Sequence, residues 1–290
     1  MIYNLGSINL DMVYRLRDLP QAGETLSAMS FDRFLGGKGV NQSVAIAASG
    51  EPVCHIGAVG PDGDWVLSEM DRFGVGTGSV ARIEEATGHA IVAVDDAAEN
   101  QIIIFGGANQ AIPFEWAEER LGDLEEGDFV LCQNETNLTP EVAQLVSDRD
   151  AKLVLSAAPF DAEHVKTLRP YIQVLAVNEG EAGALSSAFG ERPQDMGFAM
   201  LVVTRGGEGT TVYSDGQVFE QPAFRVNPID TTGAGDTFIG SFIARLSAGD
   251  TLETALTYAA AAAALQVTKP GAAEAIPHRD AVLEFLKERS

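Results

Sequence analysis

The stretch Asp230-Thr-Thr-Gly-Ala-Gly-Asp236, followed by the apolar run Phe238–Ala244, decides most of what this sequence predicts. A Gly-Ala-Gly turn that enters a helix leaves backbone N–H groups unpaired at the helix N-terminus, where the peptide dipoles add about half a positive charge. Such a turn binds anions, above all phosphates. Asp236 would stand in the first turn beside that anion, where a carboxylate can take a proton from an attacking hydroxyl. The plainer interpretation is a helix cap, because Asp is also favoured at this position by the helix dipole.

Two other elements favour phosphoryl transfer. The first is Gly36-Gly-Lys-Gly-Val-Asn41, whose glycines let the backbone approach a ligand closely; standing alone, it is equally typical of a plain turn with a solvated lysine. The second contains Asn9 and Asp11, just after an expected strand at Ile2–Leu5. These two side chains point to the same side of an extended chain, which suits neighbouring sugar hydroxyls, although Asx turns are the commoner use of such residues at strand ends.

Composition narrows the class of protein. The chain has 290 residues, 46% of them hydrophobic, and a net charge of −23, which argues against nucleic acid or an anionic membrane as partner. Two cysteines, Cys54 and Cys132, make a disulfide framework implausible and predict a reduced, cytoplasmic setting. We find no secretory leader pattern, no apolar run long enough for a bilayer, no P-loop and no metal-ligand spacing among the four histidines.

Short apolar runs alternate with helical patterns through most of the chain, which predicts a parallel sheet covered by helices on both faces. The expected strands are 53–59, 129–132, 152–155, 172–176 and 200–204, and the expected helices are 64–72, 114–121, 140–149, 178–188, 251–268 and 279–287. Residues 10–33 and 88–106 instead contain β-like segments without helices. They predict either a small lid over the site or an extension of the sheet edge.

In this order, the three motifs resemble the PfkB, or ribokinase-like, family of carbohydrate kinases, over essentially the whole chain. Within the family they are most similar to the ribokinases, and Pro20-x-x-Gly23-Glu24-Thr25 adds to the likeness. The resemblance implies one domain over residues 1–290, a three-layer α/β/α sandwich with a mostly parallel central sheet and a small β-sheet lid. It also implies transfer of the γ-phosphate of ATP to a primary hydroxyl of a pentose, which is the 5-hydroxyl in ribose.

The resemblance also implies roles for single residues. Asp236 would be the catalytic base, and the anion hole would be formed by the amides of Gly233, Ala234 and Gly235. The sugar would be held by Asn9, Asp11, Gly37, Lys38, Asn41, Glu135 and Asp236. The nucleotide would be bound by Asn178, Thr204, Gly206, Gly207 and Gly209. Glu181 would serve Mg²⁺, directly or through water.

Ribokinases are activated by a monovalent cation such as K⁺, so the resemblance implies a site for one. The corresponding positions here are Asp230, Thr232, Lys269 and Gly271, but Ala275 stands where ribokinases often carry a Ser hydroxyl. K⁺ activation is therefore left open. A second departure is Ser156-Ala-Ala-Pro159, where ribokinases usually show Asn-Pro-Ala-Pro. The lids of relatives often pair across two subunits, which predicts a homodimer.

Two kinds of alternative stay open from the sequence. One is another kinase of the same family, acting on a different sugar or on a nucleoside; a nucleoside kinase would need an apolar pocket for the base. The other is a non-catalytic sugar-binding regulator built on the kinase fold, against which the presence of Asp236 argues.

Overall fold

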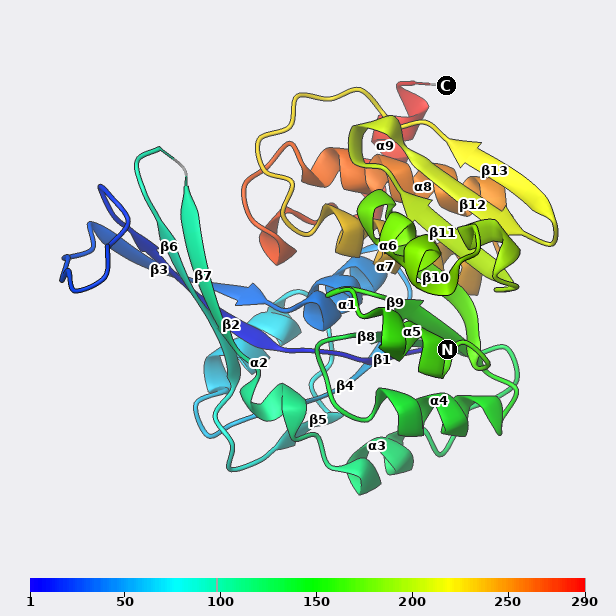
Figure 1. The fold of residues 1–290 in the computed structure, drawn as a ribbon, viewed down its shortest axis with the longest axis horizontal. Helices are drawn as coiled ribbons and strands as arrows, with labels where there is room; N and C mark the ends of the chain where they lie inside the picture. Colours follow the sequence, from blue (N-terminus) through cyan, green and yellow to red (C-terminus); the bar gives the residue numbers. More distant parts are fainter. Residues whose placement is uncertain (98, 290) are drawn as a thin grey trace.

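A computed structural model describes residues 1–97 and 99–289, and within them the strands form two separate sheets (Figure 1). The larger sheet has nine strands in the order β13-β12-β11-β10-β9-β8-β1-β4-β5. Their bounds are β1 Ile2–Leu5, β4 Val53–Val59, β5 Val80–Arg82, β8 Phe129–Gln133, β9 Lys152–Ser156, β10 Ile172–Asn178, β11 Met200–Thr204, β12 Thr210–Ser214 and β13 Gln217–Gln221. Neighbouring strands are parallel from β11 through β10, β9, β8, β1 and β4 to β5. At the other edge, β12 and β13 are added in antiparallel pairing.

Helices cover both faces of this sheet, as the sequence predicts. They are α1 Lys38–Ala48, α2 Asp64–Arg72, α3 Phe114–Arg120, α4 Thr139–Ser147, α5 Ala162–Leu168, α6 Glu179–Phe189, α7 Ala234–Ser247, α8 Leu252–Gln266 and α9 Arg279–Lys287, with short 3₁₀ turns at Gly107–Gln110, Pro193–Asp195, Gly206–Glu208 and Ala273–Ala275. None of the helices in the described part of the chain is long and apolar enough to cross a membrane. The result is the expected three-layer sandwich.

The strands read as continuous apolar runs because successive residues enter different cores. Val154 packs with α7 and α8 on one face, whereas its neighbours Leu153 and Leu155 pack with α3 to α6 on the other. A strand buried on both faces keeps no polar side to alternate with. The carboxyl ends of these parallel strands lie at one edge, which is where ligands bind in such sheets.

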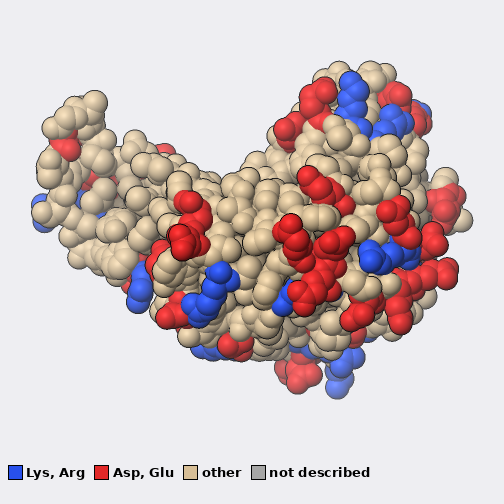
Figure 2. All heavy atoms as spheres, turned by 90° about the horizontal axis from the view of Figure 1, so that it is seen from below, with Lys and Arg blue, Asp and Glu red and all other residues tan. Residues whose placement is uncertain are grey.

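The second sheet projects from the body as an arm (Figure 1) and has the order β3-β2-β6-β7. Its strands are β2 Asn9–Arg15, β3 Ser30–Gly36, β6 Gly88–Val94 and β7 Asn100–Phe105. Because it is a sheet of its own, the two β-rich segments form the lid and not an extension of the main sheet. Figure 2 shows a hollow between this arm and the body.

Candidate active site

Asp236 lies in the first turn of α7, as expected, but the helix begins earlier than the apolar run from Phe238 indicates. Gly233 caps it with φ 74°, and Ala234 and Gly235 are already helical. A positive φ is strained for residues with a side chain, which explains the glycine at the cap. The N–H of Ala234 donates to the carbonyl of Thr231, so Gly233 and Gly235 remain as the better candidates for an anion hole.

The Asp236 carboxylate is held by two neighbouring amides of α1. Asn41 Nδ2 donates to Oδ2 at 3.2 Å, and Gln42 Nε2 donates to Oδ1 at 2.9 Å. Burial raises the pKa of Asp236 to about 6, against the lowering effect of Lys38 and the two amides, and Glu135 raises it further. A carboxyl with a pKa near 6 is ionised at neutral pH yet basic enough to accept a proton.

Glu135 is hydrogen-bonded to the glycine loop, although the sequence around it matches the family motif only loosely. Its Oε2 accepts from the backbone N–H of Lys38 at 3.0 Å and from the Ser7 hydroxyl at 2.6 Å. Gly37 stands at φ 97°, and a Cβ there would lie 2.9 Å from the Ser7 carbonyl oxygen. The loop, the first strand end and Glu135 are therefore packed into one wall.

Asn9 and Asp11 alternate along β2 on one face of the lid, as expected. Asn109 donates to the side-chain oxygen of Asn9 at 2.8 Å. This fixes the orientation of the Asn9 amide, whose NH₂ donates to no side chain or carbonyl of the described residues. The Asp11 carboxylate packs directly over Gly36, where any Cβ would collide with it. Burial raises the pKa of Asp11 to about 6, with Glu135 and then Glu274 adding to the shift.

A cavity of about 220 Å³ brings the motifs from distant parts of the chain together. Lys38 comes from α1, Asn178 and Glu181 from the start of α6, Thr204 from the end of β11, and Gly233 to Asp236 from α7. These residues share one space at the carboxyl edge of the sheet, where helix-start amides, the Asp236 carboxylate and further oxygen atoms lie together.

The residues expected to bind nucleotide also have structural roles. The side chains of Asn178 and Glu181 form a reciprocal capping box on α6, which stabilises the helix start. Gly206 and Gly207 are exposed in the turn between β11 and β12. Gly209 is buried, and a Cβ there would lie 2.1 Å from the Gln221 carbonyl oxygen, so close packing alone explains this glycine.

The positions expected to hold a monovalent cation are already bonded to one another. Asp230 accepts from the backbone N–H groups of Thr232 at 2.9 Å and of Gly271 at 3.0 Å. The buried Gln266 then donates its Nε2 to the carbonyls of both Thr232 and Gly271. Lys269 is exposed.

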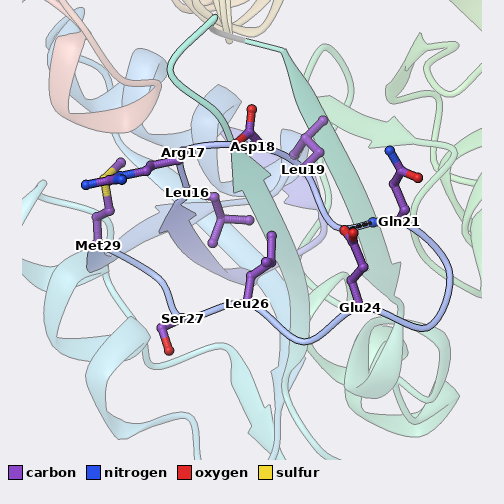
Figure 3. Close-up of a pocket in the computed structure, with 9 residues that line it drawn as sticks. All are labelled: Leu16, Arg17, Asp18, Leu19, Gln21, Glu24, Leu26, Ser27 and Met29. Carbon is purple, nitrogen blue, oxygen red and sulfur yellow. Dashed lines mark hydrogen bonds between the residues drawn. The ribbon is translucent and has the colours of Figure 1, made fainter.

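A larger hollow, about 500 Å³, lies in the lid loop between β2 and β3 (Figure 3). The residues that line it all come from the segment between Leu16 and Met29. At its rim, the backbone N–H of Gln21 donates to the Glu24 carboxylate at 3.0 Å. Glu24 of the Pro20–Thr25 motif lines it, but it contains none of the residues expected to bind the sugar, the nucleotide or an ion, so we do not assign it to the chemistry.

Sequence reasoning missed several buried amides that organise this site. They are Gln42, Asn109, Gln133 and Gln266. Gln42 directly follows Asn41, and this adjacency to a predicted ligand is a signal that could have found it. Asn109 and Gln133 bond to residues far along the chain, and Gln266 bonds to Thr232, 34 positions away, and to the nearby Gly271. None of the three carries a local pattern.

Comparison with known proteins identifies the family of this chain. The profile of pfkB family carbohydrate kinases matches residues 1–279. A ribokinase from Bacillus subtilis is 35% identical over 295 residues, covering 97% of this chain and 98% of the relative. The crystal structure of a ribokinase from Thermotoga maritima superimposes with a TM-score of 0.89 at 32% identity, covering 99% of each chain. The structure of an Arabidopsis thaliana ribokinase complexed with ribose and ATP superimposes with a TM-score of 0.88 at 30% sequence identity, covering 99% of this chain and 98% of that one.

The family match extends over residues 1–279, and the ribokinases of Bacillus subtilis and Thermotoga maritima align over nearly the whole chain. The chain therefore belongs to the pfkB family of carbohydrate kinases and is a sugar kinase.

Proposed function

We propose that this kinase is a ribokinase, which transfers the γ-phosphate of ATP to the 5-hydroxyl of D-ribose. The observation that carries the proposal is the position of Asp236, beside the Gly233–Gly235 turn on one side and bonded to Asn41 of the glycine loop on the other. The base thus stands between an anion seat and a polar sugar wall. The full-length likeness to ribokinases supports ribose as the sugar.

In the proposed reaction, Asn9, Asp11 and Glu135 hold the sugar hydroxyls, and Lys38 supplies positive charge near the phosphate. Asp236 accepts the proton of the 5-hydroxyl as its oxygen attacks the γ-phosphorus. The bond from that phosphorus to the bridging oxygen breaks, and ADP leaves with the electron pair. The amides of Gly233 and Gly235 stabilise the charge that develops on the transferred phosphoryl group.

The donors near Glu181 fit Mg²⁺. Its carboxylate and the Asn178 side chain offer oxygen atoms at the cavity wall, which is the donor type that Mg²⁺ prefers. When bound with the nucleotide, Mg²⁺ would neutralise charge on the phosphates. Glu181 already accepts the Asn178 N–H through one oxygen, so we propose that it acts on the metal through water.

The residues expected to bind K⁺ fit that ion less well than the residues near Glu181 fit Mg²⁺. The carbonyls of Thr232 and Gly271, which would be its ligands, already accept hydrogen bonds from Gln266. Ala275 also lacks a hydroxyl. We therefore propose that this chain transfers phosphate without a monovalent cation.

We further propose that two chains pair through their lids. All six residues of β7 are exposed, including Ile102, Ile103 and Ile104 at 53%, 67% and 66%. Figure 2 shows few charged side chains on the arm, whereas acidic ones gather over the body. An unpaired edge strand with such an apolar surface favours association.

A substrate screen tests the proposed function. Purified protein with ATP and Mg²⁺ is offered D-ribose, 2-deoxy-D-ribose, a hexose and inosine, and sugar phosphate is measured directly. Ribose should give the highest kcat/KM. Preference for inosine would transfer the assignment to the nucleoside kinases, whose solved structures at about 20% identity share the fold.

A further inference from the structure

A row of fully buried side-chain amides lies behind Asp236, in the interior of the sheet. Gln133 Nε2 donates to Gln42 Oε1 at 2.7 Å and to Asn4 Oδ1 at 2.9 Å. Gln42 in turn donates through Nε2 to Asp236 Oδ1. All three amides have no exposed surface, so they contact neither solvent nor substrate.

The orientation of every amide in this row follows from one backbone carbonyl. Asn4 Nδ2 lies 2.7 Å from the carbonyl oxygen of Gly39, which can only accept, so this end of Asn4 must be the NH₂ group. Its other end, Oδ1, must then accept, and Gln133 must present its NH₂. Gln42 therefore receives a donor at Oε1 and has its own NH₂ turned toward Asp236.

The opposite end of the network agrees. His55 Nε2 lies 3.2 Å from the carbonyl of Gly6, so Nε2 carries the proton, and Nδ1 accepts from the Ser43 hydroxyl at 2.8 Å. Burial lowers the pKa of His55 to about 4, despite the Gly6 bond, so the ring is neutral. The Ser43 oxygen then accepts from Asn4 Nδ2 at 2.8 Å, consistent with the same orientation.

The network keeps this orientation although one of its atoms is left without a partner. Gln133 Oε1 is buried and unbonded among the described residues, which is costly in a protein interior. Turning Gln133 over would pair nothing better, since its oxygen would then face two other oxygens. The two donor contacts of Gln133 are what the arrangement preserves.

We propose that Gln42 is a positioning residue for the base Asp236, and that Gln133 keeps the NH₂ end of Gln42 turned toward the carboxylate. This rests on the proposed function, since it takes Asp236 as the base. A Gln42 amide turned the other way would place an oxygen against the carboxylate and favour its protonated form, which cannot accept the sugar proton. The charged groups facing Asp236 are Lys38 from α1 and Glu135 from the loop after β8.

The role differs from that of Asn41, which borders the sugar wall. Gln42 touches Asp236 from the buried side only. Its loss should change the protonation and aim of the base and leave sugar binding intact. The signature is a lower kcat at neutral pH with an unchanged KM for the sugar.

The test compares Gln42→Met, which keeps the length of the side chain but removes the donor, with the wild type. Two readouts are used: the pH dependence of kcat with ribose and ATP, and the ¹³C NMR titration of the Asp236 carboxyl without substrates. Loss of a hydrogen bond to a charged group should move both midpoints upward by about one to two pH units. Gln133→Met should move them in the same direction, because Gln42 is then free to turn over.

Ser241→Ala is the matched control. Ser49 donates to Ser241 at 3.2 Å, both are buried, and this bond also joins the α1 segment to α7, but away from Asp236. The control should lower thermal stability and leave both midpoints in place. If Gln42→Met does not fold, Gln133→Met carries the test.

The outcomes separate the two claims. No sugar phosphate from the wild type overturns the proposed function, whatever the titration shows. Wild-type turnover that Asp236→Asn abolishes, together with wild-type midpoints in both Gln variants, overturns the role of Gln42. Shifted midpoints in the Gln variants but not in Ser241→Ala support it.

Discussion

The side-chain amide of Gln266 donates to the carbonyl of Thr232, the residue just before the Gly233 cap of α7. It also reaches the carbonyl of Gly271. One neutral donor thus contacts both carbonyls around which a monovalent cation was expected, closely at Thr232 and at 3.5 Å, the outer limit of a hydrogen bond, at Gly271. The N–H groups of this buried amide balance part of the negative charge on the two carbonyl oxygens.

We therefore predict that wild-type kcat/KM changes by less than about twofold when K⁺ replaces tetramethylammonium at equal ionic strength. Gln266→Ala should lose activity and recover part of it with K⁺, because the freed carbonyls can then bind the ion. Thermal melting gives a readout without turnover: K⁺ should stabilise the variant and not the wild type. A wild type that needs K⁺ would show that the amide does not replace the cation.

The pH dependence of turnover should report the base. The pKa of Asp236 is raised to about 6, and the carboxyl must be ionised to accept a proton. We expect kcat to fall about tenfold per pH unit below this value. The pKa of Asp11 is also raised to about 6, but Asp11 is expected to contact the sugar, so its titration should change KM. The Asp11→Asn variant should therefore show the same fall of kcat at acidic pH as the wild type. A flat kcat profile from pH 5 to 8 would contradict Asp236 as base.

The same raised pKa predicts a cost in stability. The folded state binds the Asp236 proton more tightly than the unfolded chain, so between about pH 4 and 6 the contribution of this group to stability falls as the pH rises. At pH 8 the protein holds a poorly solvated carboxylate. Asp236→Asn should raise Tm at pH 8 by about 2–4 °C, with a smaller gain at pH 5. An equal gain at both pH values would not be explained by titration.

Gly39 is fixed by a backbone contact. A Cβ at Gly39 would lie 2.3 Å from the Cα of Gly6. Both contacting atoms belong to backbone segments, which cannot move aside as the end of a flexible side chain can. Gly39→Ala should lower the free energy of unfolding by about 1–3 kcal/mol and reduce activity. Gly183 lies in helix α6, and no atom of the described residues beyond its own helix backbone comes within 4 Å of a Cβ built there. For Gly183→Ala we therefore expect a gain of about 0.5–1 kcal/mol. Urea unfolding measures both.

The lid surface predicts the oligomeric state. Ile103→Lys places a charge on the exposed lid strand and should convert a dimer into a monomer in light scattering. Ile229→Lys, an equally exposed isoleucine at 70% outside the lid, should leave the dimer unchanged. A monomeric wild type at micromolar concentration would remove the lid interface.

Much of the fold was predictable because its strands and helices show in the residue pattern of short segments. The buried strands around Val154 appear as apolar runs, and the lid segments lack helical periodicity. The start of α7 was misjudged, because Gly-Ala-Gly is typical of a turn, whereas only the left-handed Gly233 lies outside the helix. Its two helical members could not be distinguished from loop residues by type.

The motif residues were predictable as a set, but their supports were not. The hydrogen bond from Gln133 to Gln42 joins residues 91 positions apart, and that from Gln133 to Asn4 joins residues 129 apart. Pairings of this kind depend on which strands become neighbours. A single glutamine in an apolar stretch gives no sign of its partner, so these roles emerge only from the folded chain.

The most direct test of the central claim is ³¹P NMR of the product formed from D-ribose, ATP and Mg²⁺ by the wild type and by Asp236→Asn. We predict a 5-phosphate ester with the wild type and a rate lower by about 10²–10⁴-fold in the variant, which should remain folded. A wild type that leaves ribose unmodified, or a variant that retains the wild-type rate, would contradict the account.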